Sequence, residues 1–172
     1  MPDFRFVKFD DMVCRQTAFG NHPLGAQGSL AYGGRFNPPA LFQLLYTSLS
    51  PKGVKAEFIK FSKSRGQRPE ELLPREAHQL FVTLHKVIDL TDSHNRKLLN
   101  CSARDLVGDD WKLTQKIGMR FNGVCDAIIS FSAAAPKEKN LILYESGIRH
   151  VVILASSVIV EMSEWDKIIT EY

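Results

Sequence analysis

The stretch Gly33-Gly34-Arg35-Phe36-Asn37-Pro38-Pro39 is the most informative part of the sequence. Glycine has no Cβ, so the backbone that carries Arg35 can approach a ligand closely, and the two prolines stiffen the exit from the loop. Arginine presents a planar fork of donors that fits phosphate oxygens in a bidentate manner. The motif predicts an anion-binding loop; a surface loop with an incidental arginine is the alternative.

The segments on either side of this motif predict a long loop and a buried strand. Residues 18–40 are irregular and rich in glycine, and a loop of this length in a compact domain is usually functional. Residues 42–48 are apolar enough for a buried strand, which carries Tyr46. By itself, a tyrosine on such a strand is more typical of a core residue than of a ligand contact.

A helix is predicted directly after this strand. Ser50 is suited to the N-cap position and Pro51 to the first helical position. An apolar face follows at helical spacing, formed by Val54, Phe58 and Phe61. Glu57 lies beside that face, where an exposed helix carboxylate is the simplest interpretation.

The rest of the chain mixes strands and helices. Strands are predicted over residues 4–9, 79–90, 125–132, 140–145 and 150–161, helices over 92–100 and 109–122, and a loop or broken helix over 66–77. Gly123 is suited to close the second helix. This order differs from the regular alternation of a doubly wound sheet.

Composition favours an ordinary globular protein that is soluble and cytoplasmic. A chain of 172 residues with 44% hydrophobic residues is long enough for one domain with one core. The net charge of +3 is spread along the chain, which argues against a nucleic-acid-binding surface. The three cysteines are widely spaced and predict reduced thiols. No apolar stretch is long enough to predict a membrane span, and the N-terminus does not resemble a signal peptide.

Several common sites are not predicted. The sequence contains no phosphate-binding or dinucleotide-binding glycine motif, no HExxH motif and no GxSxG motif. The five histidines show no ligand spacing, so we expect no metal site. Trp111 is interpreted as a packing residue of a helix rather than as a stacking platform.

Taken together, these features resemble the RES-domain family, which is named after an arginine, a glutamate and a serine. Arg35 matches the arginine and Glu57 the glutamate. Ser132 is assigned as the serine, with Ser130 as the alternative. Further matches are Thr114-Gln115, Gly123, Asp126, the sequence Phe131-Ser132-Ala133-Ala134, and Arg15 as a second arginine. The resemblance covers roughly residues 13–160, and we expect residues 1–172 to form a single RES domain.

The resemblance implies an α+β fold similar to ADP-ribosyltransferases: a split, largely antiparallel β-sheet with surrounding helices and an NAD⁺ cleft between the sheet halves. Arg35 and Arg15 are then suited to the pyrophosphate or the nicotinamide-side ribose, and Tyr46 to stacking on the nicotinamide. Glu57 is suited to stabilise the ribosyl cation formed as the glycosidic bond breaks. Ser132 is suited to hydrogen-bond the ribose or the nicotinamide amide.

The implied function is that of a toxin in a type II toxin–antitoxin system, which depletes NAD⁺ without a metal. Water, inorganic phosphate or a protein side chain could accept the ribosyl group, giving a glycohydrolase, a phosphorylase or an ADP-ribosyltransferase. Phe131 departs from the family pattern next to Ser132, so a degenerate, non-catalytic binding module is the alternative. The implied partner is an Xre-like antitoxin that covers the active site, and a homodimer within a larger complex is also conceivable. Direct binding to nucleic acid or membrane is not expected.

Overall fold

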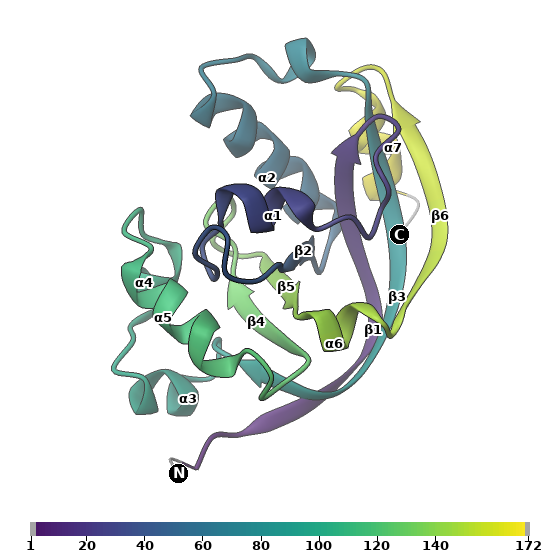
Figure 1. The fold of residues 1–172 in the computed structure, drawn as a ribbon. Coiled ribbons are helices and arrows are strands. Elements are labelled where there is room, and N and C mark those ends of the chain that lie inside the picture. The colour runs from purple at the N-terminus through teal and green to yellow at the C-terminus, as the bar shows by residue number, and fades with distance from the viewer. Residues whose placement is uncertain (1–2, 171–172) are drawn as a thin grey trace.

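The computed structural model describes residues 3–170, and within them six strands form one sheet (Figure 1). The strands are β1 (Phe6–Ala18), β2 (Leu45–Ser48), β3 (Arg75–Asp89), β4 (Ala127–Phe131), β5 (Lys139–Leu143) and β6 (Val151–Ile159). Their order is β1-β2-β5-β4-β3-β6, and β1 also pairs with β3. This additional pairing closes the sheet into a barrel, with β6 continuing along the outer edge of β3.

The pairing confirms a largely antiparallel sheet but not a split one. Only β3 and β4 run parallel among the described pairings, through the register Val87↔Ala127 to Asp89↔Ile129. The expectation of two sheet halves was wrong for this chain, because β1 pairs with β3 from Phe6↔Ile88 to Ala18↔Arg75 and joins the two sides. The expected similarity to ADP-ribosyltransferases stays a prediction.

The helices cover the outside of the barrel. They are α1 (Gln27–Tyr32), α2 (Pro51–Ser64), α3 (Ser93–Leu98), α4 (Ala103–Val107), α5 (Lys112–Phe121), α6 (Glu145–Ile148) and α7 (Glu164–Thr170), with a 3-10 turn at Pro69–Leu72. Figure 1 shows α3, α4 and α5 grouped on the side opposite β6. The predicted start of α2 is confirmed, because the Ser50 side chain accepts a hydrogen bond from the Gly53 amide at 3.0 Å.

Two strands are longer than the sequence indicated. The strand predicted over 4–9 extends to Ala18, and the one predicted over 79–90 begins at Arg75. Each supplies the other with backbone partners along this length, a contact that local periodicity does not reveal. Helices α1, α4, α6 and α7 were also not predicted; none of the four exceeds seven residues.

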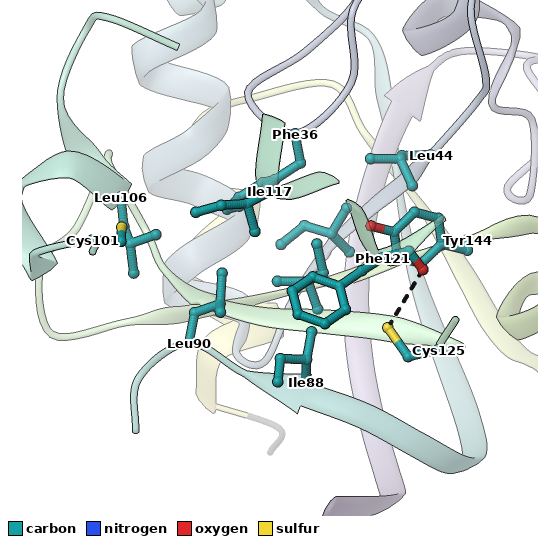
Figure 2. Packing of buried hydrophobic residues seen from close by; sticks show 12 residues of the cluster. Phe36, Leu44, Ile88, Leu90, Cys101, Leu106, Ile117, Phe121, Cys125 and Tyr144 are labelled. Carbon is teal, nitrogen blue, oxygen red and sulfur yellow. Dashed lines mark hydrogen bonds between the residues drawn. The ribbon is translucent and has the colours of Figure 1, made fainter. Parts of the chain in front are cut away.

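The core consists of three apolar clusters. Side chains from β1 to β5 fill the barrel, among them Val13, Leu45 and Leu80. A second cluster lies between α4, α5 and the strands, where Phe36 packs with Ile117 (Figure 2). The third cluster, formed by Cys14, Val54, Phe58, Ile159 and Trp165, joins α2 and α7 to the sheet. The helices are therefore packed firmly on the sheet, which can hold the side chains of a site rigidly.

Neither a membrane-spanning helix nor a metal-binding cluster is present in the described part of the chain. No helix within residues 3–170 is long and apolar enough to cross a membrane. No group of three or more histidine, cysteine, aspartate or glutamate side chains in the same part of the chain is arranged to hold a metal ion.

Candidate functional site

The carboxylate of Glu57 is the centre of the candidate site. It projects from the second turn of α2, beside the face that carries the buried Val54 and Phe58. Its Oε1 atom accepts a hydrogen bond from the Ser132 hydroxyl at 2.7 Å and another from the Asn140 amide at 2.8 Å. Glu57 is half-buried, and these two donors fix one carboxylate oxygen, while Oε2 makes no hydrogen bond to the described residues.

Ser132 holds Glu57 in place. It follows β4, is fully buried, and its hydroxyl donates to Glu57 while it accepts hydrogen bonds from the backbone amides of Ala134 and Ala135. A hydroxyl has one donor and two acceptor positions, so all of its capacity is used. The alternative, Ser130, has only a long contact of 3.4 Å to the Phe131 carbonyl. The structure therefore brings Ser132, and not Ser130, to Glu57.

Asn140 is a residue that sequence analysis missed. It lies in β5 opposite Ser48 of β2 and Ser130 of β4. Its amide nitrogen donates to Glu57, and its carbonyl oxygen accepts from the Ser48 hydroxyl at 2.9 Å. These two bonds fix the orientation of the amide, and its N–H group stabilises the charged form of the carboxylate.

Arg35 lies across from this carboxylate on the glycine loop. Its Nη1 atom donates to the Gly108 carbonyl, and its guanidinium lies 5.5 Å from the ring centre of Trp111. Burial lowers the pKa of Arg35 below its ordinary value, and the negative charges of Glu57 and Asp109 partly offset this effect. Arg35 is thus half-buried within the electrostatic range of Glu57. Trp111 lies at the N-cap of α5 and is 41% exposed, and its interpretation as a packing residue stays a prediction.

Tyr46 fastens the loop that carries Arg35. Its hydroxyl donates to Asn37 Oδ1 at 2.9 Å and accepts from the Phe36 amide at 3.0 Å. Burial raises the pKa of Tyr46 well above its ordinary value, so the phenol stays protonated. A Cβ on Gly34 would lie 2.5 Å from the same hydroxyl oxygen, which explains why glycine is needed there. The stacking role expected for the Tyr46 ring stays a prediction.

Helix α5 holds the loop from the other side. The Gln115 side chain donates to the backbone carbonyls of Gly34 and Asn37 at 3.0 and 3.3 Å. A Cβ on Gly118 would lie 1.6 Å from the Phe36 carbonyl oxygen, so the loop backbone rests directly on the helix. Of the Thr114-Gln115 pair noted in the sequence, Gln115 therefore holds the loop, while the buried Thr114 donates to the Trp111 carbonyl at 3.1 Å.

Arg15 lies in β1 beneath the same loop. Its two terminal nitrogens donate to the carbonyls of Tyr46 and Gly25, at 3.3 and 2.6 Å. Its Nε atom is buried and has no hydrogen-bond partner, and burial lowers the Arg15 pKa to about 10. The side chain ties β1 to the loop, and no carboxylate within residues 3–170 lies within 4 Å of it.

The comparison with protein families agrees with this arrangement. A family model described as the RES domain matches residues 12–164. The chain belongs to the RES domain family. Within the matched range, Arg35 and Glu57 lie within electrostatic range of each other, and Ser132 contacts Glu57 directly.

Similar proteins are known from mycobacteria. The NAD(+) phosphorylase MbcT of Mycobacterium tuberculosis is 28% identical over 114 residues, or 65% of this RES domain chain and 61% of MbcT. A probable NAD(+) phosphorylase from the same species is 31% identical over 72% of this chain and 59% of its own length. The matches thus span about three fifths of these relatives. The crystal structure of the M. tuberculosis MbcT–MbcA toxin–antitoxin complex matches with a TM-score of 0.85 and 20% identity, covering 96% of this chain and 92% of the other, which shows the fold.

Proposed function

We propose that this RES domain is an NAD⁺ phosphorylase that acts as the toxin of a toxin–antitoxin pair. The observation that carries the proposal is the oriented carboxylate of Glu57, held by Ser132 and Asn140 within electrostatic range of Arg35. Relatives named as NAD(+) phosphorylases support the same activity.

Arg35 supplies the contact to the pyrophosphate of NAD⁺. Its guanidinium is held by the Gly108 carbonyl and the Trp111 ring, contacts that leave N–H donors for phosphate oxygens. Because the loop is fastened by Tyr46 and Gln115, the donors are positioned before the substrate binds. A preorganised cation of this kind lowers the entropic cost of binding.

Glu57 stabilises the sugar as the bond to nicotinamide breaks. The C1–N bond of the nicotinamide riboside cleaves with both electrons leaving on the nicotinamide nitrogen, so nicotinamide departs neutral and positive charge develops on the ribose. A carboxylate fixed by two donors faces that charge without having to reorganise. No general acid is needed, which agrees with a site built without histidine or cysteine in its described contacts.

Inorganic phosphate is the acceptor in this proposal. One phosphate oxygen forms a bond to the ribose carbon that nicotinamide has left, and the products are nicotinamide and ADP-ribose phosphorylated at that carbon. Attack by water would instead give ADP-ribose, and attack by a side chain a modified protein. The positive charges of Arg35 and Arg15 favour an anionic acceptor.

A protein that consumes NAD⁺ requires a partner that restrains it. The structural neighbour is a toxin–antitoxin complex, which supports an antitoxin for this chain as well. The family resemblance implies an Xre-like antitoxin that covers the candidate site of Arg35 and Glu57. The antitoxin would carry the DNA-binding function, in keeping with the weak net charge of +3 on this chain.

The test is nicotinamide release from NAD⁺ by the purified chain, with and without phosphate, followed by mass analysis of the ribosyl product. We expect phosphate-dependent release and a phosphorylated ADP-ribose. Release that is equally fast without phosphate would replace phosphorylase by glycohydrolase activity. If nicotinamide is released under neither condition, NAD⁺ cleavage is refuted, and the non-catalytic binding module becomes the better interpretation.

A matched pair of glutamate variants separates chemistry from folding. Glu57→Gln keeps the shape of the side chain but removes the charge that faces the ribosyl cation, so turnover should fall at least about 100-fold. Glu145→Gln changes an exposed carboxylate that pairs with Arg149 on the surface of α6, and turnover should stay unchanged. Wild-type turnover in Glu57→Gln would remove this residue from the mechanism.

A further inference from the structure

Lys60 follows Glu57 by about one turn of α2 and is half-buried beside the candidate site. Side chains three positions apart on a helix are neighbours, and a glutamate and a lysine at such spacing commonly form an ion pair. Here they do not, because no carboxylate oxygen of the described residues lies within 4 Å of Lys60 Nζ. The ammonium group is therefore an uncompensated cation next to the carboxylate.

The segment that joins β4 to β5 fixes the position of this cation. The Lys60 ammonium donates to the Ala133 carbonyl at 3.0 Å, directly after the serine that holds Glu57. At the other end of the segment, the Ser50 hydroxyl at the N-cap of α2 donates to the Glu138 carboxylate. These contacts lay the segment along α2, so the cation and the carboxylate are held side by side before a ligand binds.

Lys60 keeps donors available for a ligand. An ammonium group has three N–H donors, and only one of them is used by Ala133. The other two make no hydrogen bond to the described residues. Because the side chain is only partly buried, these two N–H groups are within reach of a molecule that enters the site.

The other cations around the site have different partners. Arg35 is assigned to the pyrophosphate of NAD⁺ in the proposed function, and both terminal nitrogens of Arg15 donate to backbone carbonyls. Lys139 in β5 donates to the Thr91 hydroxyl at 2.9 Å. Among these side chains, Lys60 is the one placed to bind a second anion beside the carboxylate.

An anionic acceptor requires such a cation. Inorganic phosphate and the Glu57 carboxylate are both negative, so they repel each other as phosphate approaches the ribose carbon that the carboxylate faces. Water is neutral and meets no such repulsion. A site with the carboxylate alone would therefore favour hydrolysis, whereas a cation beside the carboxylate offsets the repulsion and admits phosphate.

We propose that Lys60 binds the phosphate acceptor and thereby selects phosphorolysis over hydrolysis, an inference that rests on the proposed function. Phosphate accepts hydrogen bonds from the two available N–H groups. One of its oxygens forms the bond to the ribose carbon, while the electron pair of the breaking C–N bond leaves with nicotinamide. Lys60 is then an acceptor-binding residue, and Glu57 acts on the ribosyl cation.

The test compares the phosphate dependence of nicotinamide release in Lys60→Gln and in the original chain. Glutamine keeps an N–H donor for the Ala133 carbonyl and removes the charge. We expect KM for phosphate to rise about 10–100-fold, as for the loss of hydrogen bonds to a charged group, while KM for NAD⁺ changes less than about twofold. Mass analysis should show a larger fraction of ADP-ribose among the ribosyl products.

Two further variants control for structural effects. Lys60→Arg restores the charge and should recover most of the affinity for phosphate. Lys52→Gln removes an exposed lysine from the first turn of the same helix and should leave KM for phosphate and the product ratio unchanged. Thermal unfolding of each variant shows whether it is folded.

The outcomes distinguish this inference from the proposed function. Release that does not depend on phosphate in the original chain would overturn both. Release that depends on phosphate, with an unchanged KM for phosphate in Lys60→Gln, would overturn this inference alone. An equal loss of affinity for NAD⁺ and phosphate, or a Lys60→Arg variant no better than Lys60→Gln, would show that the lysine only holds the Ala133 segment and would also overturn it.

Discussion

Replacing Tyr46 by phenylalanine tests whether the tyrosine acts through its hydroxyl or through its ring. The change keeps the ring that was expected to stack on nicotinamide and removes only the oxygen. That oxygen accepts from the Phe36 amide at 3.0 Å and donates to Asn37 Oδ1 at 2.9 Å. Both partners belong to buried residues of the loop that carries Arg35, with Phe36 1% and Asn37 0% exposed.

The magnitude follows from the two partners that are left behind. A buried donor or acceptor that loses its partner costs about 1–3 kcal/mol, so we expect Tyr46→Phe to lower the free energy of unfolding by about 2–4 kcal/mol. For a chain of this size that corresponds to a decrease in Tm of roughly 5–15 °C. Because the freed loop positions Arg35, KM for NAD⁺ should rise about tenfold or more, a loss of about 1.4 kcal/mol in binding.

Tyr144→Phe is the matched control. Tyr144 is as buried as any residue in the core, yet its hydroxyl makes one bond, to the Gly118 carbonyl at 2.7 Å. That carbonyl also accepts from the Asn122 amide, so it keeps a partner after the change. We expect a cost of about 0.5–1.5 kcal/mol and no change in KM.

Thermal and denaturant unfolding, together with steady-state nicotinamide release, distinguish the two roles. If Tyr46→Phe is as stable as Tyr144→Phe and binds NAD⁺ normally, the hydroxyl does not fasten the loop, and the ring-stacking role gains support. A loss of stability with unchanged KM would show that the loop can loosen without affecting Arg35.

Three further predictions concern other parts of the site and the core. Ser132→Ala should lower kcat about 10–100-fold, with a smaller effect on KM, and cost about 2–3 kcal/mol in unfolding, because it releases Glu57 and two backbone amides. Gly118→Ala should lower the free energy of unfolding by about 3 kcal/mol or more, since its Cβ would overlap the loop backbone. Gly28→Ala is the control: its Cβ meets no atom within 4 Å, so denaturant unfolding should show a neutral or stabilising effect. Burial lowers the pKa of His78 below its ordinary 6.5, so the unfolded chain binds a proton first. Stability should therefore fall as the pH decreases below about 6.5, and His78→Gln should reduce this slope in thermal unfolding at each pH.

Each of these has a clear contrary result. Unchanged kcat in Ser132→Ala would mean that Asn140 alone orients the carboxylate. Equal stability of the two glycine variants would show that the loop does not rest on α5. If the dependence of stability on pH is the same in His78→Gln, groups other than this histidine take up the proton. In the folded chain the His78 ring lies between the hydroxyls of Thr17 and Ser156.

The sequence predicted best where short-range signals suffice. Ser50 and Pro51 marked the start of α2 because a helix cap involves only the next three residues. Ser132 and Glu57 were assigned to one site only through the family resemblance, since nothing in either local pattern indicates a partner 75 positions away.

The features that the sequence did not predict depend on contacts between distant parts of the chain. Asn140 has no motif of its own and reaches Glu57 only because β5 lies between β2 and β4. The closure of the barrel likewise required the pairing of β1 with β3, and the hydroxyl contacts of Tyr46 required the fold of the loop back over β2. The periodicity of a single sequence does not reveal these neighbours, so the contacts of Tyr46 and Asn140 could not be predicted from it.

The distance along the chain between Glu57 and its two partners sets the order in which the site can appear during translation. Glu57 leaves the ribosome early, but Ser132 and Asn140 follow 75 and 83 residues later. At roughly 5–20 residues per second, the carboxylate is therefore synthesised several seconds before anything can orient it. Chains that end before Ser132 lack both donors, so under the proposed function an oriented carboxylate first exists after residue 140 has been made.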